Sequence, residues 1–213
     1  DSIMNRFDEI SALLQKGRPR ELSALVQEEL ADGTSANDIL TKALIPGMSA
    51  VGERFKKNEI FVPEVLITAR AMNAALNILN PVLAQAGVEP IGKAVICTVK
   101  GDLHDIGKNL VKMMIEGTGI QVIDLGIDCP PERVVEAVRE YQPDIVCLSA
   151  LLTTTMVNQK ATIDALRAAG LRDKVKVMVG GAPVTQAFAD EIGADSYTPD
   201  AATAAEVARS YFN

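Results

Sequence analysis

The chain has 213 residues, enough for one large or two small domains, and 48% of them are apolar, enough for a packed core. Its 28 acidic and 21 basic residues give a net charge of −7, which argues against nucleic acid or a membrane surface as the main partner. No apolar run reaches the roughly 18 residues that a membrane-spanning helix needs, and we expect no signal peptide.

The first 86 residues or so carry only the 3.6-residue apolar period of helices. The expected helices cover residues 2–16, 19–32, 35–55 and 63–83, to within a few residues. Ser2 is a candidate N-cap for the first helix, whose apolar face begins at Ile3. Pro46-Gly47 is expected to interrupt the third helix. Four helices joined by short loops predict an antiparallel bundle.

Glycine and proline cluster at residues 87–92 and the period changes there, so we expect a boundary between domains 1–88 and 89–213. Beyond it, short apolar runs alternate with helical ones. The expected strands are 93–99, 120–124, 144–149, 175–179 and 195–197, and the expected helices are 106–117, 131–141, 155–169, 184–192 and 200–211. This alternation predicts a five-stranded, doubly wound parallel sheet of Rossmann or flavodoxin type with right-handed crossovers.

The three cysteines, Cys97, Cys129 and Cys147, form no C-x-x-C pair. Cys97 and Cys147 fall inside expected buried strands, where a thiol behaves as a small apolar side chain. An odd number of unpaired thiols fits a reducing compartment, and we expect the protein to be cytoplasmic.

The single histidine, His104, lies between the strand-like run 93–99 and the helical run that begins at Ile106. Ligands of open parallel sheets bind at the carboxyl ends of strands, where this loop is expected. Asp102 could hold one ring nitrogen and leave the other for a metal. A lone histidine is usually an ordinary satisfied side chain, but Asp-x-His-x-x-Gly, ending at Gly107, favours a ligand.

A phosphate-binding loop is an alternative for the same stretch, since Gly101 and Gly107-Lys108 resemble the pattern G-x-x-x-x-G-K-[ST]. Here five residues separate the glycines, and Asn109 stands where a Ser or Thr would ligate magnesium. The spacing and the missing hydroxyl both argue against this alternative.

Two further loops are expected at the same edge of the sheet. If the strand order is flavodoxin-like, the first and third strands are neighbours; the third leads into Ser149–Thr155, and the fourth ends at Gly180-Gly181. Hydroxyls can donate to and accept from a polar ligand, and glycines let it approach the backbone. Helix N-capping by a threonine and a tight turn at the glycines are simpler explanations that stay open.

These motifs resemble those of a known family. Three of them, in the expected order, are similar to the signature of cobalamin-binding domains of the methionine-synthase type: Asp102-x-His104-x-x-Gly107, Ser149-x-Leu151 and Gly180-Gly181. The segments 47–55 and 61–66 resemble the helical cap of those proteins. The size and layout resemble stand-alone corrinoid proteins that serve cobalamin-dependent methyltransferases.

The resemblance implies that the chain binds cobalamin, as methylcobalamin in the loaded state. His104 would be the lower axial ligand to cobalt and Asp102 its hydrogen-bond partner. Thr155 matches a hydroxyl that completes this relay, where the family has Ser; its extra methyl group leaves the geometry open. Phe55 and Val62 match cap residues over the upper, methyl-bearing face, although bundle packing would also explain them. Other expected cofactor contacts are Gly101, Leu103, Asp105, Gly107, Ser149, Leu151, Thr153, Gly180, Gly181 and Ala201.

The implied function is that of a corrinoid methyl carrier, which has no complete reaction of its own. A substrate-specific methyltransferase would load it, a second one would pass the methyl group to coenzyme M or tetrahydrofolate, and a reductive activase would be a third partner. The alternatives are a cobalamin-binding sensor or regulator, the small subunit of an adenosylcobalamin mutase, and a flavodoxin-like binder of FMN or phosphate. The sequence has no basic helix-turn-helix segment, which disfavours a DNA-binding regulator.

Overall fold

The computed structural model describes residues 5–213, and these divide into two units. One unit holds residues 5–90 together with Gly117–Gly119, and the other holds 91–116 and 120–213. Ser2 and Ile3, assigned above to the first helix, lie outside the described residues. Asn5 caps that helix instead, because its side chain accepts a hydrogen bond from the N–H of Asp8 at 2.9 Å.

The unit that contains residues 5–90 is helical, as expected. Its elements are α1 (Arg6–Gln15), α2 (Pro19–Ala31), α3 (Ala36–Ile39), a π-helical turn η1 (Leu40–Leu44), α4 (Ile45–Lys56) and α5 (Val62–Gln85). Helix α1 packs on α2 and α4, and α5 packs on α2 and α4, so the apolar faces meet in one core. The largest fully buried side chains there include Ile10, Leu14, Leu22, Ile39, Leu44, Met48, Met72 and Leu79.

Pro46-Gly47 does not interrupt the third helix, so that expectation was wrong. The chain stays helical from Ala36 to Lys56, because the π-helical turn η1 comes directly before the proline. Pro46 has no N–H to donate, and the N–H of Ile45 bonds the carbonyl of Leu40, five residues back. A widened turn of this kind lets a helix accommodate a proline that would otherwise break it.

The second unit alternates strands and helices. Its strands are β1 (Gly92–Thr98), β2 (Ile120–Asp124), β3 (Ile145–Ser149), β4 (Lys176–Gly180) and β5 (Ser196–Tyr197). Its helices are α6 (Ile106–Glu116), α7 (Pro131–Tyr141), α8 (Thr153–Ala168), α9 (Gln186–Ile192) and α10 (Ala201–Ser210), with a short 3-10 turn η2 (Arg172–Lys174). The elements agree with the expected ones to within a few residues.

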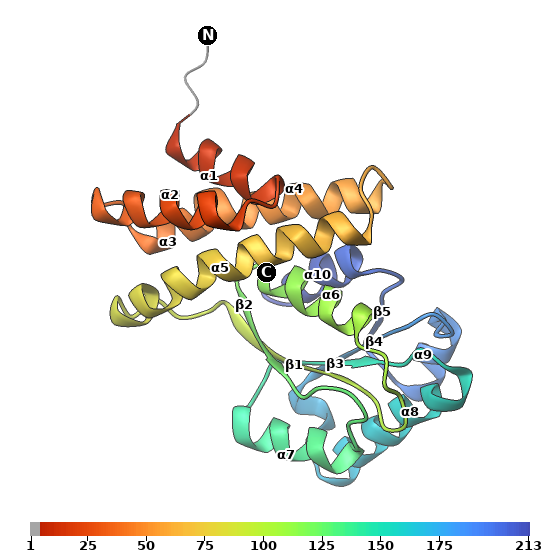
Figure 1. The fold of residues 1–213 in the computed structure, drawn as a ribbon. Coiled ribbons are helices and arrows are strands. Elements are labelled where there is room, and N and C mark those ends of the chain that lie inside the picture. Colours follow the sequence, from red (N-terminus) through yellow and green to blue (C-terminus); the bar gives the residue numbers. More distant parts are fainter. Residues whose placement is uncertain (1–4) are drawn as a thin grey trace. The chain divides into compact units, whose positions relative to one another are not determined.

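All strand pairs are parallel, and the strand order is β2-β1-β3-β4-β5, which confirms the flavodoxin-like sheet. Helices α6 and α10 pack together on one face, and α7 and α8 pack together on the other (Figure 1). Because both faces are covered, the central strands are buried along nearly their whole length.

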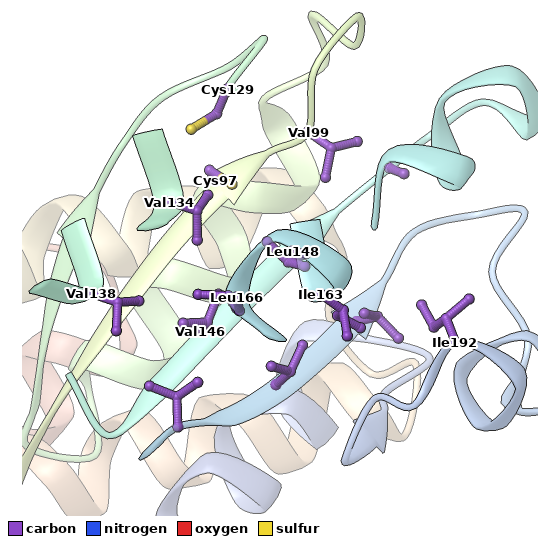
Figure 2. Close-up of a cluster of buried hydrophobic side chains, with 14 of the residues drawn as sticks. Cys97, Val99, Cys129, Val134, Val138, Val146, Leu148, Ile163, Leu166 and Ile192 are labelled. Atoms are coloured by element: carbon purple, nitrogen blue, oxygen red, sulfur yellow. The ribbon is translucent and has the colours of Figure 1, made fainter. Parts of the chain in front are cut away.

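The face covered by α7 and α8 carries a core of apolar side chains from the sheet and these helices (Figure 2). Cys97 and Cys129 belong to this core, and Cys147 is buried on β3, so all three thiols are free and buried. Burial raises the pKa of Cys147 to about 12, which keeps this thiol protonated and unreactive. Cys97 and Cys147 are therefore small core side chains, as their positions in the sequence indicated.

None of the helices in residues 5–213 combines the length and the apolar character that crossing a membrane requires.

Replacing Ile163, which is fully buried in this core, should remove a large part of the stability of the α/β unit. We expect Ile163→Ala to lower its free energy of unfolding by about 3 kcal/mol, because the side chain leaves a cavity between α8 and the sheet. Urea unfolding followed by circular dichroism measures the change. Val157→Ala, at an exposed position on the same helix, is the control, and an equal loss in both variants would contradict the packing.

Candidate functional site

The loop between β1 and α6, residues 99–105, lies at the carboxyl edge of the sheet. Strand β1 pairs with β2 on one side and with β3 on the other. The strand order therefore reverses at β1, and the chain crosses to one face of the sheet after β1 and to the other face after β3. The loops after these two strands therefore start side by side at this edge of the sheet. Gly101 turns the backbone with φ +82°, a conformation that favours glycine.

Asp102 is the residue that joins these loops. Its Oδ1 accepts the backbone N–H of His104 at 3.1 Å and lies 2.8 Å from His104 Nδ1. Its Oδ2 accepts the N–H of Leu151 at 2.8 Å and the hydroxyl of Thr155 at 2.6 Å. The side chain is fully buried, so the structure compensates this carboxylate with four donors from two loops.

These contacts fix the charge of the site. Burial by itself raises the pKa of Asp102, but the hydrogen bonds from the Thr155 hydroxyl, the Leu151 N–H and His104 outweigh it and hold the pKa well below its usual range. Asp102 is thus a carboxylate and can only accept. The proton of the neutral imidazole must then lie on Nδ1, and the lone pair of Nε2 is available to a ligand.

The His104 side chain is partly open to solvent. Half of its side chain is exposed, and Nε2 has no hydrogen-bond partner within residues 5–213. The exposed apolar side chains at this edge are Leu103, Ile106, Leu151 and Leu152. No group of three His, Cys, Asp or Glu side chains in the described part of the chain could hold a metal ion. A corrin ring supplies most of the ligands of its own metal, so a single imidazole nitrogen without another partner fits a corrinoid.

The resemblance to a phosphate loop is explained by a different role of Lys108. Its Nζ, almost fully buried, lies 2.8 and 2.7 Å from the two carboxylate oxygens of Asp124 and 2.8 Å from Asn109 Oδ1. All three ammonium protons are used, and the ion pair ties the first turn of α6 to the end of β2. Burial by itself raises the pKa of Asp124, but Lys108 and the Gly126 N–H lower it overall. Lys108 is therefore not available to bind a phosphate.

Thr155 serves the fold as well as the site. It is the third residue of α8, and its hydroxyl accepts the N–H of Leu152 at 3.3 Å in addition to bonding Asp102. Ser149 is half-buried at the end of β3, and Thr153 is the exposed first residue of α8. The N-cap residue is Leu152, whose side chain makes no capping bond, so none of the threonines occupies the N-cap itself.

Close packing explains glycine at the end of β4. A Cβ on Gly181, whose φ is +127°, would lie 1.7 Å from the carbonyl oxygen of Ala150, so this position requires glycine whatever the cofactor does there. A Cβ on Gly180 would lie 3.2 Å from the carbonyl oxygen of Thr198, which is tight but less restrictive.

The structure places most of the expected site residues along one edge of the α/β unit. The β1–α6 loop and the first turn of α6 contribute Gly101, Asp102, Leu103, His104, Asp105 and Gly107; the ends of β3 and β4 contribute Ser149, Leu151, Thr153, Thr155, Gly180 and Gly181. Ala201 is the buried first residue of α10. Phe55 on α4 and Val62 on α5 belong to the helical unit, where both are half-buried.

The sequence analysis did not identify three residues that bond the backbone of the β1–α6 loop. Thr98, Asp128 and Asn158 bond its backbone from β1, from the loop after β2 and from α8. Asp128 and Asn158 lie far from His104 in sequence, and no spacing rule connects them to it. Ile106 and Leu152 were also missed, although apolar side chains beside the histidine motif were a usable signal.

Comparisons with known proteins agree with this site. Residues 92–208 match the family model of the B12 binding domain, and residues 6–80 match a second B12 binding domain model. The chain therefore belongs to the B12-binding family, in its corrinoid-protein branch. It is 42% identical over 207 residues to monomethylamine corrinoid protein 1 of Methanosarcina acetivorans, covering 95% of each chain.

Two solved structures share the whole architecture. A cobalamin-binding protein from Desulfitobacterium hafniense superposes with a TM-score of 0.80 at 33% identity, covering 98% of this chain and 99% of that one. A chain of the methanol:cobalamin methyltransferase complex from Methanosarcina barkeri superposes with a TM-score of 0.87 at 30% identity, covering 97% of this chain and 79% of that one. The cofactor of the family is thus a corrinoid, and the fold expected from the sequence is confirmed.

The lowered pKa of Asp102 makes the free energy of unfolding depend on pH in the acidic range. A carboxyl whose pKa falls on folding stabilises the native state above its unfolded value of about 3.9, and this contribution disappears as the pH drops below it. We expect Asp102→Asn to be less stable at pH 7 and to lose less further stability between about pH 5 and pH 3. Urea unfolding at several pH values measures this. Asp105→Asn, at an exposed position in the same loop, should keep the parental pH dependence, and an unchanged profile in Asp102→Asn would contradict the assignment.

Proposed function

We propose that this chain carries a methyl group on a bound corrinoid, with His104 as the ligand below the metal. When bound, the corrinoid supplies a cobalt ion that takes up and releases the methyl group. The observation that carries the proposal is the Asp102–His104 pair: a buried carboxylate fixes Nδ1 of a half-exposed imidazole and leaves Nε2 without a hydrogen-bond partner in residues 5–213.

The residues around this pair have separate tasks. Asp102 keeps the imidazole in one tautomer, and the Thr155 hydroxyl shares that carboxylate. Leu103 and Leu151, both exposed, offer apolar surface on the two loops that Asp102 joins. A Cβ on Gly107 would meet no atom within 4 Å, so this position leaves open space at the start of α6.

A wider set of residues is proposed to contact the cofactor and its nucleotide tail. They share a place at or next to the carboxyl edge of the sheet, or at the start of α10: Gly101, Asp105, Ser149, Thr153, Gly180, Gly181 and Ala201. For Gly180 and Gly181 the assignment rests on the family motif, because protein backbone already fills the space that their side chains would take.

The helical unit is proposed to be a cap, with the cap domain at 1–88 and the cobalamin-binding domain at 89–213. Phe55 and Val62 would cover the face of the corrinoid that carries the methyl group and exclude water from it. The match of residues 6–80 to a B12 binding domain model of their own supports a cofactor-related role for this unit. A cap must also open for a partner enzyme, so we expect it to move during transfer.

The proposed partners are two methyltransferases, one that delivers the methyl group and one that passes it to coenzyme M or tetrahydrofolate, with a reductive activase for the oxidised cofactor. Similarity to a chain of a methyltransferase complex supports the first kind of partner. Relatives named for monomethylamine and for methanol share this fold, so the choice of methyl donor belongs to the partner enzyme. A match to corrinoid proteins along nearly the whole chain favours a carrier over a regulator or a mutase subunit.

Loss of the imidazole should be visible in the spectrum of the bound cofactor. We expect the chain reconstituted with hydroxocobalamin to show the absorbance spectrum of a histidine-ligated corrinoid. His104→Ala should lose that spectrum, because the sequence has no other histidine to replace it. Lys160→Ala, exposed on α8, is the control, and identical spectra in all three proteins would refute the ligand assignment.

The cap assignment makes a second prediction. Phe55→Ala should let dissolved cyanide reach the bound cobalamin faster, because less apolar surface would shield it. Stopped-flow absorbance measures the rate, and Phe7→Ala on α1 is the matched control. If Phe55 is only part of the bundle core, Phe55→Ala should lower the free energy of unfolding and leave the cyanide rate at the parental value.

A further inference from the structure

The backbone of the His104 loop is held by side chains from three other elements. The Thr98 hydroxyl donates to the carbonyl of His104 at 2.7 Å, and Asn158 Nδ2 donates to the carbonyl of Lys100 at 2.7 Å. The Asp128 carboxylate accepts the N–H of Gly101 at 2.7 Å, and the Asp128 N–H donates to the carbonyl of Asp102 at 2.9 Å. We call Thr98, Asp128 and Asn158 the loop clamp.

We propose that Thr98 and Asp128 are positioning residues for His104: they set the backbone of its loop so that Nε2 is aimed before any cofactor binds. The inference rests on the proposed role of His104 as the ligand, and it adds residues that the motif does not contain. Neither residue reaches the imidazole itself, so both act through the main chain.

Thr98 is suited to this task by its burial and its direction. It is the last residue of β1, it is fully buried, and its hydroxyl reaches forward to the carbonyl of the ligand residue. A buried hydroxyl must donate to something, and a valine here would leave the His104 carbonyl without this donor. The peptide after His104 is therefore fixed from inside the sheet.

Asp128 holds the other side of the loop. Its carboxylate bonds the peptide that precedes Gly101, and its N–H bonds the peptide that follows Asp102. Gly101 and Asp102 are therefore held from both ends. It does so with φ +47°, a conformation that is costly for most residues with a side chain but tolerated by aspartate and asparagine. The carbonyls of Asp102 and His104 are thus both anchored, and only exposed Leu103 lies between them.

Metal ligation depends on such support. A ligand held in its binding geometry gives up little further freedom on binding, whereas a mobile one must be ordered at that moment. The bond of Asp102 to His104 Nδ1 fixes the ring relative to Asp102, but it directs Nε2 correctly only if the backbone of both residues is fixed. The loop clamp supplies that second condition.

The first test compares Thr98→Val with Thr98→Ser in the full chain reconstituted with hydroxocobalamin. Valine keeps the shape and removes the donor, and serine restores the donor. We expect Thr98→Val to keep bound cobalamin but to lower the histidine-ligated fraction in the absorbance spectrum by about threefold or more, and Thr98→Ser to resemble the parent. A purely structural role predicts lower stability with an unchanged spectrum, and equal spectra in Val, Ser and parent would overturn the proposal.

The second test uses Asp128→Gly and Asp128→Asn, and it stands even if Thr98→Val does not fold. Glycine tolerates the positive φ and keeps the N–H, so it removes only the carboxylate contact. Asparagine keeps an acceptor oxygen and should rescue the parental spectrum. Gln142→Gly, at another positive φ on the C-cap of α7, controls for added backbone freedom. A defect in Asn equal to that in Gly would overturn the role assigned to the acceptor.

Hydrogen exchange separates this inference from the proposed function. In the full chain without cobalamin, the N–H groups of Gly101 and His104 should be protected, and their exchange should be about tenfold faster in Asp128→Gly and Thr98→Val respectively. A parent chain that fails to bind hydroxocobalamin would refute the proposed function, while the exchange rates would still decide whether the clamp exists. Parental exchange rates in both variants would refute the clamp alone.

Discussion

The buried carboxylate of Asp102 is the constraint on which the site depends. A charge in this position is tolerated only with several donors, and its four donors come from its own loop, from the loop after β3 and from the first turn of α8. The two donors from Leu151 and Thr155 are in place only when β1 and β3 are paired. The orientation of His104 is therefore a consequence of folding, and the exposed nitrogen is prepared before a cofactor arrives.

The kind of ligand that this edge of the sheet can bind depends on which of its charged side chains are already paired. The ammonium group of Lys108 is paired with Asp124, and the carboxylate of Asp102 accepts hydrogen bonds from four donors. Neither side chain therefore presents an unpaired charge to a ligand. The exposed side chains that remain on these two connections include apolar Leu103, Ile106, Leu151 and Leu152 and the charged residues Lys100 and Asp105 of the His104 loop. Because the lysine of the apparent phosphate motif is already paired, this strand–helix loop can resemble a P-loop and have a different ligand.

The parts of this structure that sequence could predict are those that depend on local pattern. Strand and helix periods and the two-residue reach from Asp102 to His104 are local, whereas the strand order is a tertiary property that entered only as the hypothesis of a flavodoxin-like sheet. The π turn before Pro46 was missed because it depends on how a helix redistributes its hydrogen bonds, which has no period. The loop clamp was missed because Asp128 and Asn158 meet the loop only through the fold. The close approach of Gly181 to the Ala150 backbone likewise depends on tertiary structure, although the sequence analysis had singled out the glycine itself.

Thr155 carries a methyl group that serine lacks and still places its hydroxyl against Asp102, with Oγ1 2.6 Å from Asp102 Oδ2. A Cβ on Gly101 would sit 3.7 Å from the extra methyl group, an ordinary van der Waals contact, so the methyl group does not crowd the loop. The same hydroxyl oxygen lies 3.0 Å from the Leu152 carbonyl oxygen and accepts the Leu152 N–H at 3.3 Å. The start of α8 therefore sets the position of this hydroxyl together with Asp102, and the added methyl group is compatible with both.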